Sequence, residues 1–491
     1  MDSLLLSPKD SRSSDSTDSS SNGGAMASLA THALETETFK VIISRHLNSE
    51  VLLAPVGNSF ALPAVLVPKW SRVTPHISER MVELSGMRTI CLFYPELQKT
   101  TDEGSTQYIV AEPIDASCEP IGLRWISRDN LWKSLSSVEE ARSAENALAT
   151  GDSYNAGTSH GNFARSGWFH ELVSWVQKHL DRYGLTTTGE FRQLNCGPTF
   201  SLVRLETTGP AVWFKAVGEP NLRELPIMTT LANHFPNYVP DLIASHPSWN
   251  GWLTFEAEGS VLDEESDIAT WRVAARTLAQ LQIESRKRVP ELLHAGCRMI
   301  QTARLLDQIE LFFDVMSRLM ARQTTLSPPP LTSDALYTLA TQLKEACRSL
   351  TEFDLPDTLG HMDFNLGNIC GSSTGCVFLD WAEAYVGHPF YTFEYLREQL
   401  SRNHPDKKAW QSEVTSCYLD PWISFASADV TTRALEVTPL IAVLAYALSN
   451  NTWQDAERVE NPKLAGYFRS LVRRMQREAQ TWDERRQRCL C

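Results

Sequence analysis

Long apolar runs are missing from this sequence of 491 residues. A helix needs about 18 or more consecutive apolar residues to cross a bilayer, and no such run occurs, so we expect no membrane span. The N-terminus has no apolar signal core either, since nine of its first 21 residues are Ser, and it lacks the Arg-rich pattern of a transit peptide. We therefore expect residues 1–35 to form a disordered tail and the protein to be cytoplasmic.

Basic charge and organised cysteines are scarce as well. The chain carries 45 Lys and Arg against 59 Asp and Glu, which gives a net charge of −14. Nucleic acid binding needs clustered basic side chains, so nucleic acid is not an expected partner. The ten Cys have neither the spacing of a zinc site nor that of a disulfide framework, so we expect reduced, mostly buried thiols. The length and the 42% hydrophobic content allow two or three domains.

The most informative segment runs from His361 to Asp380. His361, Asp363 and Asn368 stand in the order His-x-Asp-x-x-x-x-Asn, and Asp380 ends an apolar run twelve residues later. In a phosphoryl-transfer site, the first Asp accepts the proton of the attacking hydroxyl, while the Asn and the later Asp hold Mg²⁺. Taken singly, these residues also fit turn positions, a helix cap and a core histidine. Their combined order favours Asp363 and His361 as catalytic residues, and Asn368 and Asp380 as metal ligands.

The segment resembles the aminoglycoside phosphotransferase and choline kinase superfamily of small-molecule kinases. Gly367–Ile369 and Asp380-Trp381 match the typical pattern of that superfamily, whereas Met362 replaces a usual Gly, and His388 and Thr392 replace usual Asp residues. The resemblance covers residues 168–480. It implies a two-lobed, protein kinase-like α+β fold, ATP and Mg²⁺ as cofactors, and a small metabolite as the acceptor.

A kinase small lobe also requires a strand Lys that is paired with a Glu on the next helix. Lys215 is the single charge inside the apolar strand Val212–Val217, and Glu224 opens the following helix. A Lys in an apolar strand is costly unless it has a partner or a ligand. We therefore expect Lys215 and Glu224 to bind the nucleotide. The alternatives are an edge Lys that reaches solvent, and Glu219 as the partner.

Two further nucleotide contacts follow from the resemblance alone. The turn Leu194–Ser201, which contains Gly197, would cover the phosphates. Glu256 and Ala257 would lie in the interlobe hinge, where backbone groups contact adenine.

Composition divides the rest of the chain. Residues 36–148 form a first domain whose order of strands and helix resembles a Nudix domain. Aligned on Gly86, only Glu83 keeps a carboxylate of the late part of the Nudix metal-binding box, which is too few ligands for a hard divalent ion. We expect a Nudix-like domain without the catalytic box. The small polar residues at 149–166 predict a linker, and residues 167–482 form the kinase domain.

Periodicity and breakers predict the main elements of both domains. In the first domain we expect a helix at Ile77–Leu84 and strands at Phe39–Ser44, Val51–Ala54, Met87–Phe93, Gln107–Glu112 and Gly122–Ile126. In the second we expect helices at Trp168–Tyr183 and Leu222–His234, five short strands between residues 191 and 255, and mainly helices from residue 269.

The sequence therefore predicts an ATP- and Mg²⁺-dependent phosphotransferase that acts on a small-molecule hydroxyl. The chain between Asp380 and Phe393 is too short for the peptide-docking segment of a protein kinase. Two alternatives stay open. One is a pseudokinase-like binding or scaffold protein, which the intact Asp-Asn-Asp set disfavours. The other is a Nudix-type hydrolase with a regulatory kinase-like domain, which the missing Glu residues disfavour.

Overall fold

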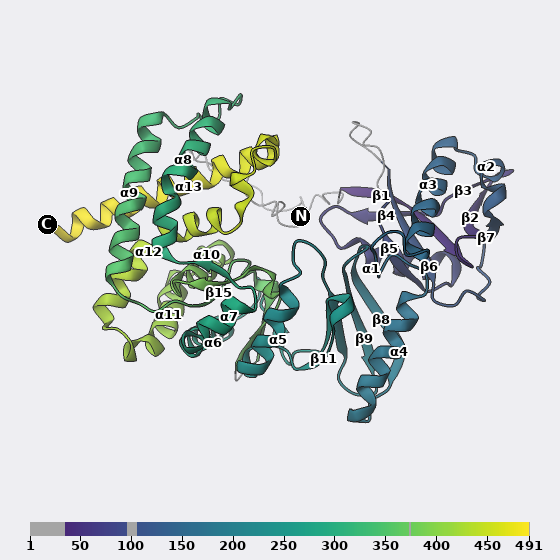
Figure 1. Cartoon of the computed structure of the whole chain (residues 1–491), viewed down its shortest axis with the longest axis horizontal. Helices are drawn as coiled ribbons and strands as arrows, with labels where there is room; N and C mark the ends of the chain where they lie inside the picture. Colours follow the sequence, from purple (N-terminus) through teal and green to yellow (C-terminus); the bar gives the residue numbers. More distant parts are fainter. Residues whose placement is uncertain (1–34, 96–105, 373–374, 491) are drawn as a thin grey trace, which may run out of the picture. The chain divides into compact units, whose positions relative to one another are not determined.

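A computed structural model describes residues 35–95, 106–372 and 375–490. The predicted tail, apart from Glu35, lies outside these residues. The chain forms two compact units, one of residues 34–299 and 356–425 and another that contains residues 300–355 and 426–491. The first of these units contains both sheets and helices, and the other consists of helices. The chain as a whole is α+β (Figure 1).

The first unit begins with a seven-stranded mixed sheet. Its central strand β1 pairs antiparallel with β2 and β4 and parallel with β6. Val41, Ile42 and Ile43 of β1 are fully buried, so both faces of the sheet are covered. The elements are β1 (Thr36–Arg45), β2 (Glu50–Val56), β3 (Ser59–Ala61), β4 (Ala64–Pro68), α1 (Val73–Ser85), β5 (Thr89–Phe93), β6 (Gln107–Pro113), β7 (Arg124–Ser127), α2 (Leu131–Ser134) and α3 (Val138–Asn155).

The predicted strands and helix of the first domain are confirmed, and Gly86 ends α1 with a left-handed φ of 71°. The sequence missed β3, β4, α2 and α3. The prediction of a linker at 149–166 is wrong for its first part, because residues 149–155 are the last two turns of α3. Tertiary bonds hold this polar helix end: Asp152 accepts from Arg128 and from Asn48, and Asn155 accepts from the backbone N–H of Ser166.

A second sheet of five strands, in the order β11-β12-β10-β9-β8, follows the helix α4. The predicted strands and helices are confirmed, with boundaries that differ by a few residues. The elements are α4 (Trp168–Leu180), β8 (Thr187–Cys196), β9 (Ser201–Thr207), β10 (Val212–Ala216), α5 (Glu224–His234), β11 (Leu242–His246) and β12 (Gly251–Phe255).

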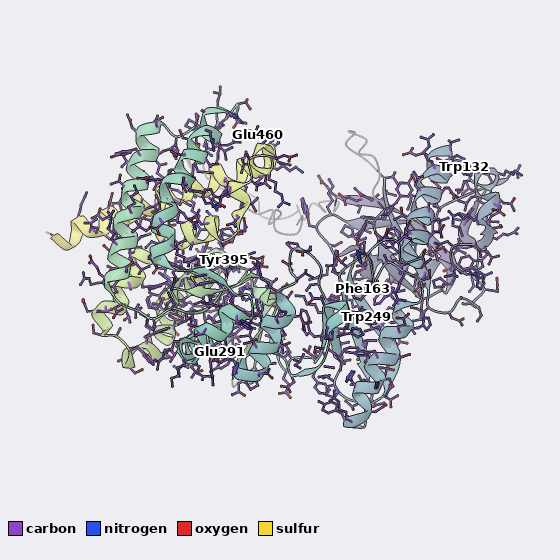
Figure 2. The ribbon with its side chains drawn as sticks, viewed as in Figure 1. Trp132, Phe163, Trp249, Glu291, Tyr395 and Glu460 are labelled. Carbon is purple, nitrogen blue, oxygen red and sulfur yellow. The ribbon has the colours of Figure 1, made fainter. Side chains whose placement is uncertain are left out.

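The two sheets share one hydrophobic core. Val51 and Ile90 of the first sheet belong to the same buried cluster as Trp168 of α4 and Phe214 of β10. The rings of Phe163 and Trp249, both labelled in Figure 2, pack edge to face at 5.8 Å within this cluster. Because aromatic side chains contribute much of the burial energy of a core, the first domain and the five-stranded sheet depend on each other for stability.

The rest of the first unit contains the segment with Asp363, Asn368 and Asp380. Two small sheets lie in this part of the chain: β16 pairs with β13 and β17, and β15 pairs with β18. The elements are β13 (Ser260–Val261), α6 (Ile268–Ser285), α7 (Val289–His294), β14 (Arg298–Ile300), β15 (Thr358–His361), β16 (Ile369–Gly371), β17 (Cys376–Phe378), β18 (Ala384–Gly387), α10 (Phe390–Asn403) and α11 (Lys408–Leu419).

The second unit is helical. It contains α8 (Thr302–Ala321), α9 (Ser333–Glu352), α12 (Ala428–Leu448) and α13 (Pro462–Leu490). Thr332 and Ser427 cap α9 and α12 by accepting from backbone N–H groups. Within the described ranges, α12 alone is long and apolar enough to cross a membrane, a possibility that the sequence did not predict. It packs against α9 and α13, and 61% of its most apolar window is buried, as in the core helix of a bundle.

Candidate active site

The strand β10 and the helix α5 bring Lys215 and Glu224 together, as the sequence predicted. The Lys215 Nζ lies 2.5 Å from Glu224 Oε1 and 2.9 Å from Asp380 Oδ1. Glu224 is buried, whereas the Lys215 and Asp380 side chains keep 22% and 45% of their surface exposed. The competing candidate Glu219 is exposed. Lys215 is therefore held between two carboxylates and does not reach freely into solvent.

The charges of this triad depend on one another. Burial raises the pKa of Glu224 to about 7, although Lys215 opposes that rise. Burial also disfavours the charge on Lys215, but Glu224 and Asp380 outweigh it and hold the Lys215 pKa above its ordinary value. At Asp380, burial would raise the pKa, yet Lys215 and, to a smaller extent, His361 bring it below its usual value. Asp380 is thus a carboxylate and Lys215 an ammonium at neutral pH.

The catalytic loop is fixed by the imidazole of His361, which is buried. Its Nδ1 accepts from the backbone N–H of Asp363 at 3.1 Å, and its Nε2 lies 3.1 Å from the carbonyl oxygen of Leu379. Both nitrogens are therefore used, and burial lowers the His361 pKa. The sequence placed His361 among the catalytic residues; the structure gives it a positioning role, because no ring nitrogen is left for a substrate.

Asp363 and Asn368 are held within the same loop. The side-chain N–H of Asn368 donates to the Asp363 carbonyl oxygen at 2.8 Å, so its amide oxygen points elsewhere. Asn365 donates to the carboxylate of Asp363 and accepts from the hydroxyl of Tyr395 on α10. Burial raises the Asp363 pKa, and the nearby His361 opposes the rise. A base with a raised pKa is suited to accept a proton near neutrality.

The hairpin β16–β17 brings the two predicted metal ligands side by side. The backbone N–H of Leu379 donates to the Asn368 carbonyl oxygen at 2.8 Å, immediately before Asp380. Asp380 has a left-handed φ of 61°. That conformation is unfavourable for a residue with a Cβ and is typical of functional sites. It turns the Asp380 carboxylate toward Lys215.

Neutral groups support the loop where the superfamily usually has Asp. The Thr392 hydroxyl accepts from the backbone N–H of His361 at 2.8 Å and lies 3.0 Å from the Tyr385 hydroxyl. A Cβ at Gly360 would meet the Tyr385 ring at 2.0 Å, so only Gly fits beside His361. Met362 is buried, and the loop therefore accommodates a side chain in place of Gly.

His388, which also stands where the resemblance has a usual Asp, is buried. Its Nδ1 accepts from the Phe390 N–H at 3.3 Å, and its Nε2 has no hydrogen-bond partner among the described residues. Burial lowers its pKa to about 3. His388 therefore braces the turn into α10 as a neutral imidazole.

The other two predicted nucleotide contacts lie at the ends of small-lobe strands. Gly197 follows β8, where a Cβ would meet the Phe200 ring at 2.4 Å. The Glu256 carboxylate accepts from Arg204 at 2.6 and 2.8 Å and from Trp213 at 3.0 Å, and its backbone N–H donates to the Ala211 carbonyl oxygen. Ala257 follows directly after it. The Glu256 side chain therefore stabilises the sheet, and the contact of Glu256 and Ala257 with adenine stays a prediction.

Sequence reasoning missed Tyr395 and Asn365 as neighbours of the site. Asn365 lies inside the quoted motif, so its position was a usable signal. Tyr395 lies 32 residues from Asp363 in the sequence, and no local pattern marks it.

The donor set fits Mg²⁺ together with a nucleotide. Asn368 and Asp380 offer two oxygen ligands side by side, and Mg²⁺ is usually held by one or two protein ligands, with phosphates and water completing its shell. Among the described residues, no group of three or more His, Cys, Asp or Glu could hold a metal ion. Asn368 and Asp380 would thus hold Mg²⁺, with Lys215 beside them for the phosphates.

Part of this chain is similar to known proteins. Residues 216–397 match the phosphotransferase enzyme family, and none of the curated protein sequences matches the chain. Similar solved structures include the macrolide 2'-phosphotransferase MphH from Brachybacterium faecium, at 16% identity and TM-score 0.40 over 60% of this chain and 98% of that chain. The choline kinase from Cryptosporidium parvum is 13% identical, with TM-score 0.46 over 65% of this chain and 97% of that chain. The ethanolamine kinase from Plasmodium vivax is 14% identical, with TM-score 0.44 over 67% of this chain and 93% of that chain.

The family match begins at Ala216, directly after Lys215, and does not reach the first domain. The Nudix-like character of residues 36–148 therefore stays a prediction. The segment that carries Glu224, Asp363, Asn368 and Asp380 is similar to the phosphotransferase enzyme family.

Proposed function

We propose that the protein is an ATP- and Mg²⁺-dependent phosphotransferase that phosphorylates a hydroxyl group of a small molecule. The observation that carries the proposal is the contact of Lys215 with both Glu224 and Asp380, which joins the small lobe to the metal-binding hairpin. A lone motif could arise by chance, whereas the contact of Lys215 with Asp380 links residues that are 165 positions apart.

Each residue has a distinct task in this proposal. Bound Mg²⁺ supplies charge neutralisation at the transferred phosphate. Asn368 and Asp380 hold the metal, and Lys215 offers its ammonium to the nucleotide phosphates. Asp363 orients the acceptor hydroxyl and accepts its proton. Asn365 holds one side of the Asp363 carboxylate, which leaves the other oxygen for the acceptor.

A small acceptor is favoured by the chain that follows Asp380. Trp381–Glu383 form a short 3₁₀ turn, Ala384–Gly387 form β18 against β15, and α10 begins at Phe390. Every residue between Asp380 and α10 is thus part of the fold, and no length is left for a peptide platform. The acceptor is therefore of metabolite size, reached at the face of Asp363.

The experiment is a screen of a metabolite library for ATP-dependent phosphorylation, followed by variants tested on the acceptor found. We expect Asp380→Asn and Asn368→Ala to lower turnover by about a hundredfold or more, because the metal contributes several kcal/mol. Asp363→Asn should lower turnover by roughly 10²–10⁴ with little change in ATP affinity, because a base acts in the transition state. Asp406→Asn, an exposed Asp, is the control. Normal turnover by Asp380→Asn would rule out the metal assignment.

A further inference from the structure

A second contact joins the helix α5 to the segment that follows Asp380. Arg223 is the residue directly before α5, at its N-cap. Its Nε donates to the Ala382 carbonyl oxygen at 3.1 Å, and its Nη2 lies 3.8 Å from Glu383 Oε1. Ala382 and Glu383 belong to the short 3₁₀ turn Trp381–Glu383, whose N-cap is Asp380. The start of α5 is therefore tied to the turn that begins at Asp380.

Glu383 is fixed from the other side by a second arginine. Its Oε2 forms an ion pair with Arg298 on β14. β14 lies in one sheet with β18 and β15, and β15 ends at His361. The side chains of Glu383, Arg298 and Arg223 keep only 13%, 18% and 25% of their surface exposed. Ion pairs that are largely removed from water are screened less than exposed ones, so Glu383 holds Arg223 more strongly than an exposed carboxylate would.

A glycine allows the chain to pack closely against Arg223. Gly296, two residues before β14, has a φ of 108°, a conformation that residues with a Cβ rarely adopt. A Cβ at this position would lie 2.9 Å from the Arg223 Cβ, which is closer than such atoms normally approach. The loop before β14 therefore packs directly on the stem of Arg223. Arg223 is thus held both by this loop and by the turn after Asp380.

The contact of Arg223 adjoins the charged groups of the candidate site at both ends. Arg223 directly precedes Glu224, and Ala382 lies two residues after Asp380. Lys215 bonds to Glu224 Oε1 and Asp380 Oδ1, whereas Glu224 Oε2 is buried and has no hydrogen-bond partner in the described part of the chain. The position of the Glu224 carboxylate therefore depends on where α5 begins, and Arg223 fixes that point.

We propose that Arg223 is a positioning residue for phosphoryl transfer. By holding the start of α5 against the turn after Asp380, it keeps Glu224 and Asp380 at the spacing that Lys215 bridges. The Lys215 ammonium is then in place for the nucleotide phosphates before they arrive, which lowers the cost of binding them. Arg223 itself touches neither nucleotide nor acceptor. This inference rests on the proposed function and assigns a task to a residue outside the catalytic motif.

The test is the affinity of the full chain for Mg²⁺-ATP, measured by titration calorimetry. Arg223→Met keeps the length of the side-chain stem and leaves Glu383 paired with Arg298, so no buried carboxylate loses its only partner. We expect it to weaken Mg²⁺-ATP binding by roughly three- to thirtyfold, because the bonds to Ala382 and Glu383 involve a charged group. Arg223→Lys should lie between Arg223→Met and wild type, since it keeps the charge near Glu383 but cannot make both bonds.

A double-mutant cycle separates positioning from a general loss of stability. Because Arg223 acts through Lys215, Arg223→Met should cause no further loss of Mg²⁺-ATP affinity in a Lys215→Met background. A loss of equal size in both backgrounds would overturn the role of Arg223, as would wild-type affinity in Arg223→Met.

Arg128→Met is the matched control. Arg128 also binds two acceptor groups, Glu145 at 2.7 Å and Asp152 at 2.6 Å, and its side chain is 23% exposed. It lies in the first domain, so its loss should lower the melting temperature and leave Mg²⁺-ATP affinity unchanged. An equal loss of affinity in Arg128→Met and Arg223→Met would show an effect of stability alone and would overturn the assignment of Arg223. Failure of the wild type to bind Mg²⁺-ATP would instead overturn the proposed function together with it.

Discussion

At the scale of single residues, the candidate site depends on a chain of hydrogen bonds that leads away from Asp363. The Tyr395 hydroxyl lies 2.9 Å from Asn365 Oδ1, and the Asn365 amide donates to Asp363. Tyr395 lies on α10 (Figure 2). A rigid helix therefore orients the base through one intermediate side chain. Such support matters because small displacements of a catalytic group are costly in rate.

Removing the hydroxyl of Tyr395 should reduce turnover without harming nucleotide binding. A hydrogen bond of this kind contributes about 0.5–1.5 kcal/mol, so we expect Tyr395→Phe to lower kcat by roughly two- to tenfold at unchanged KM for ATP. Steady-state kinetics on the identified acceptor would measure this. Tyr337→Phe, at a side chain that is 77% exposed on α9, is the control. An unchanged kcat in Tyr395→Phe would show that Asn365 holds its position unaided.

At the scale of elements, the connection between β18 and α10 shows how a neutral group replaces a usual carboxylate. His388 is buried among aromatic rings, with Phe390 and Tyr391 at 5.2 and 5.4 Å between ring centroids. Those neighbours carry no charge below pH 7, so nothing offsets the burial of an imidazolium. The folded protein therefore resists protonation of His388.

This element should make stability depend on pH in a defined direction. The His388 pKa is about 3 in the folded protein and near 6.5 when unfolded. Between these values the unfolded chain binds the extra proton, so the stabilising contribution is complete above pH 6.5 and is lost as the pH falls. From pH 6.5 to 5 the loss is about 2 kcal/mol. We expect urea unfolding to show this slope in wild type and a smaller one in His388→Asn; equal slopes would contradict the assignment.

At the scale of the whole molecule, the first domain and the small lobe act as one folding body. One buried cluster contains side chains of both parts, and α3 continues through the predicted boundary at residue 148. Deleting residues 1–148 would expose the core around Trp168 and cut α3 within its length. The first domain is therefore a structural part of the small lobe.

We expect a chain truncated to residues 149–491 to lose the cooperative fold of the small lobe. Limited proteolysis should cleave β8 and α4 rapidly in the truncated chain and slowly in the full one, because protection follows local stability. The control is an N-terminal truncation after residue 33, which leaves β1 intact. A truncated 149–491 chain with unchanged protection would show that the shared core is dispensable.

The sequence by itself determined most of the elements and placed Asp363, Asn368 and Asp380 in one segment. Asp363, Asn368 and Asp380 lie within 18 residues, and a local turn and hairpin suffice to bring them together. Helices and strands followed from periodicity and from breakers such as Gly86, which act locally. The predicted linker failed because contacts from Arg128 and Asn48 override the low helix propensity of residues 149–155.

Only the tertiary structure decided which distant residues meet. Lys215 and Asp380 are 165 positions apart, and Tyr395 carries no motif, so their places depend on how strands and helices pack. The same holds for the burial of His388 and for the shared core of the first domain. Local sequence determines where helices and strands form, whereas the burial of their apolar faces determines which of them pack together. That burial depends on the whole chain, so no single segment of the sequence shows it.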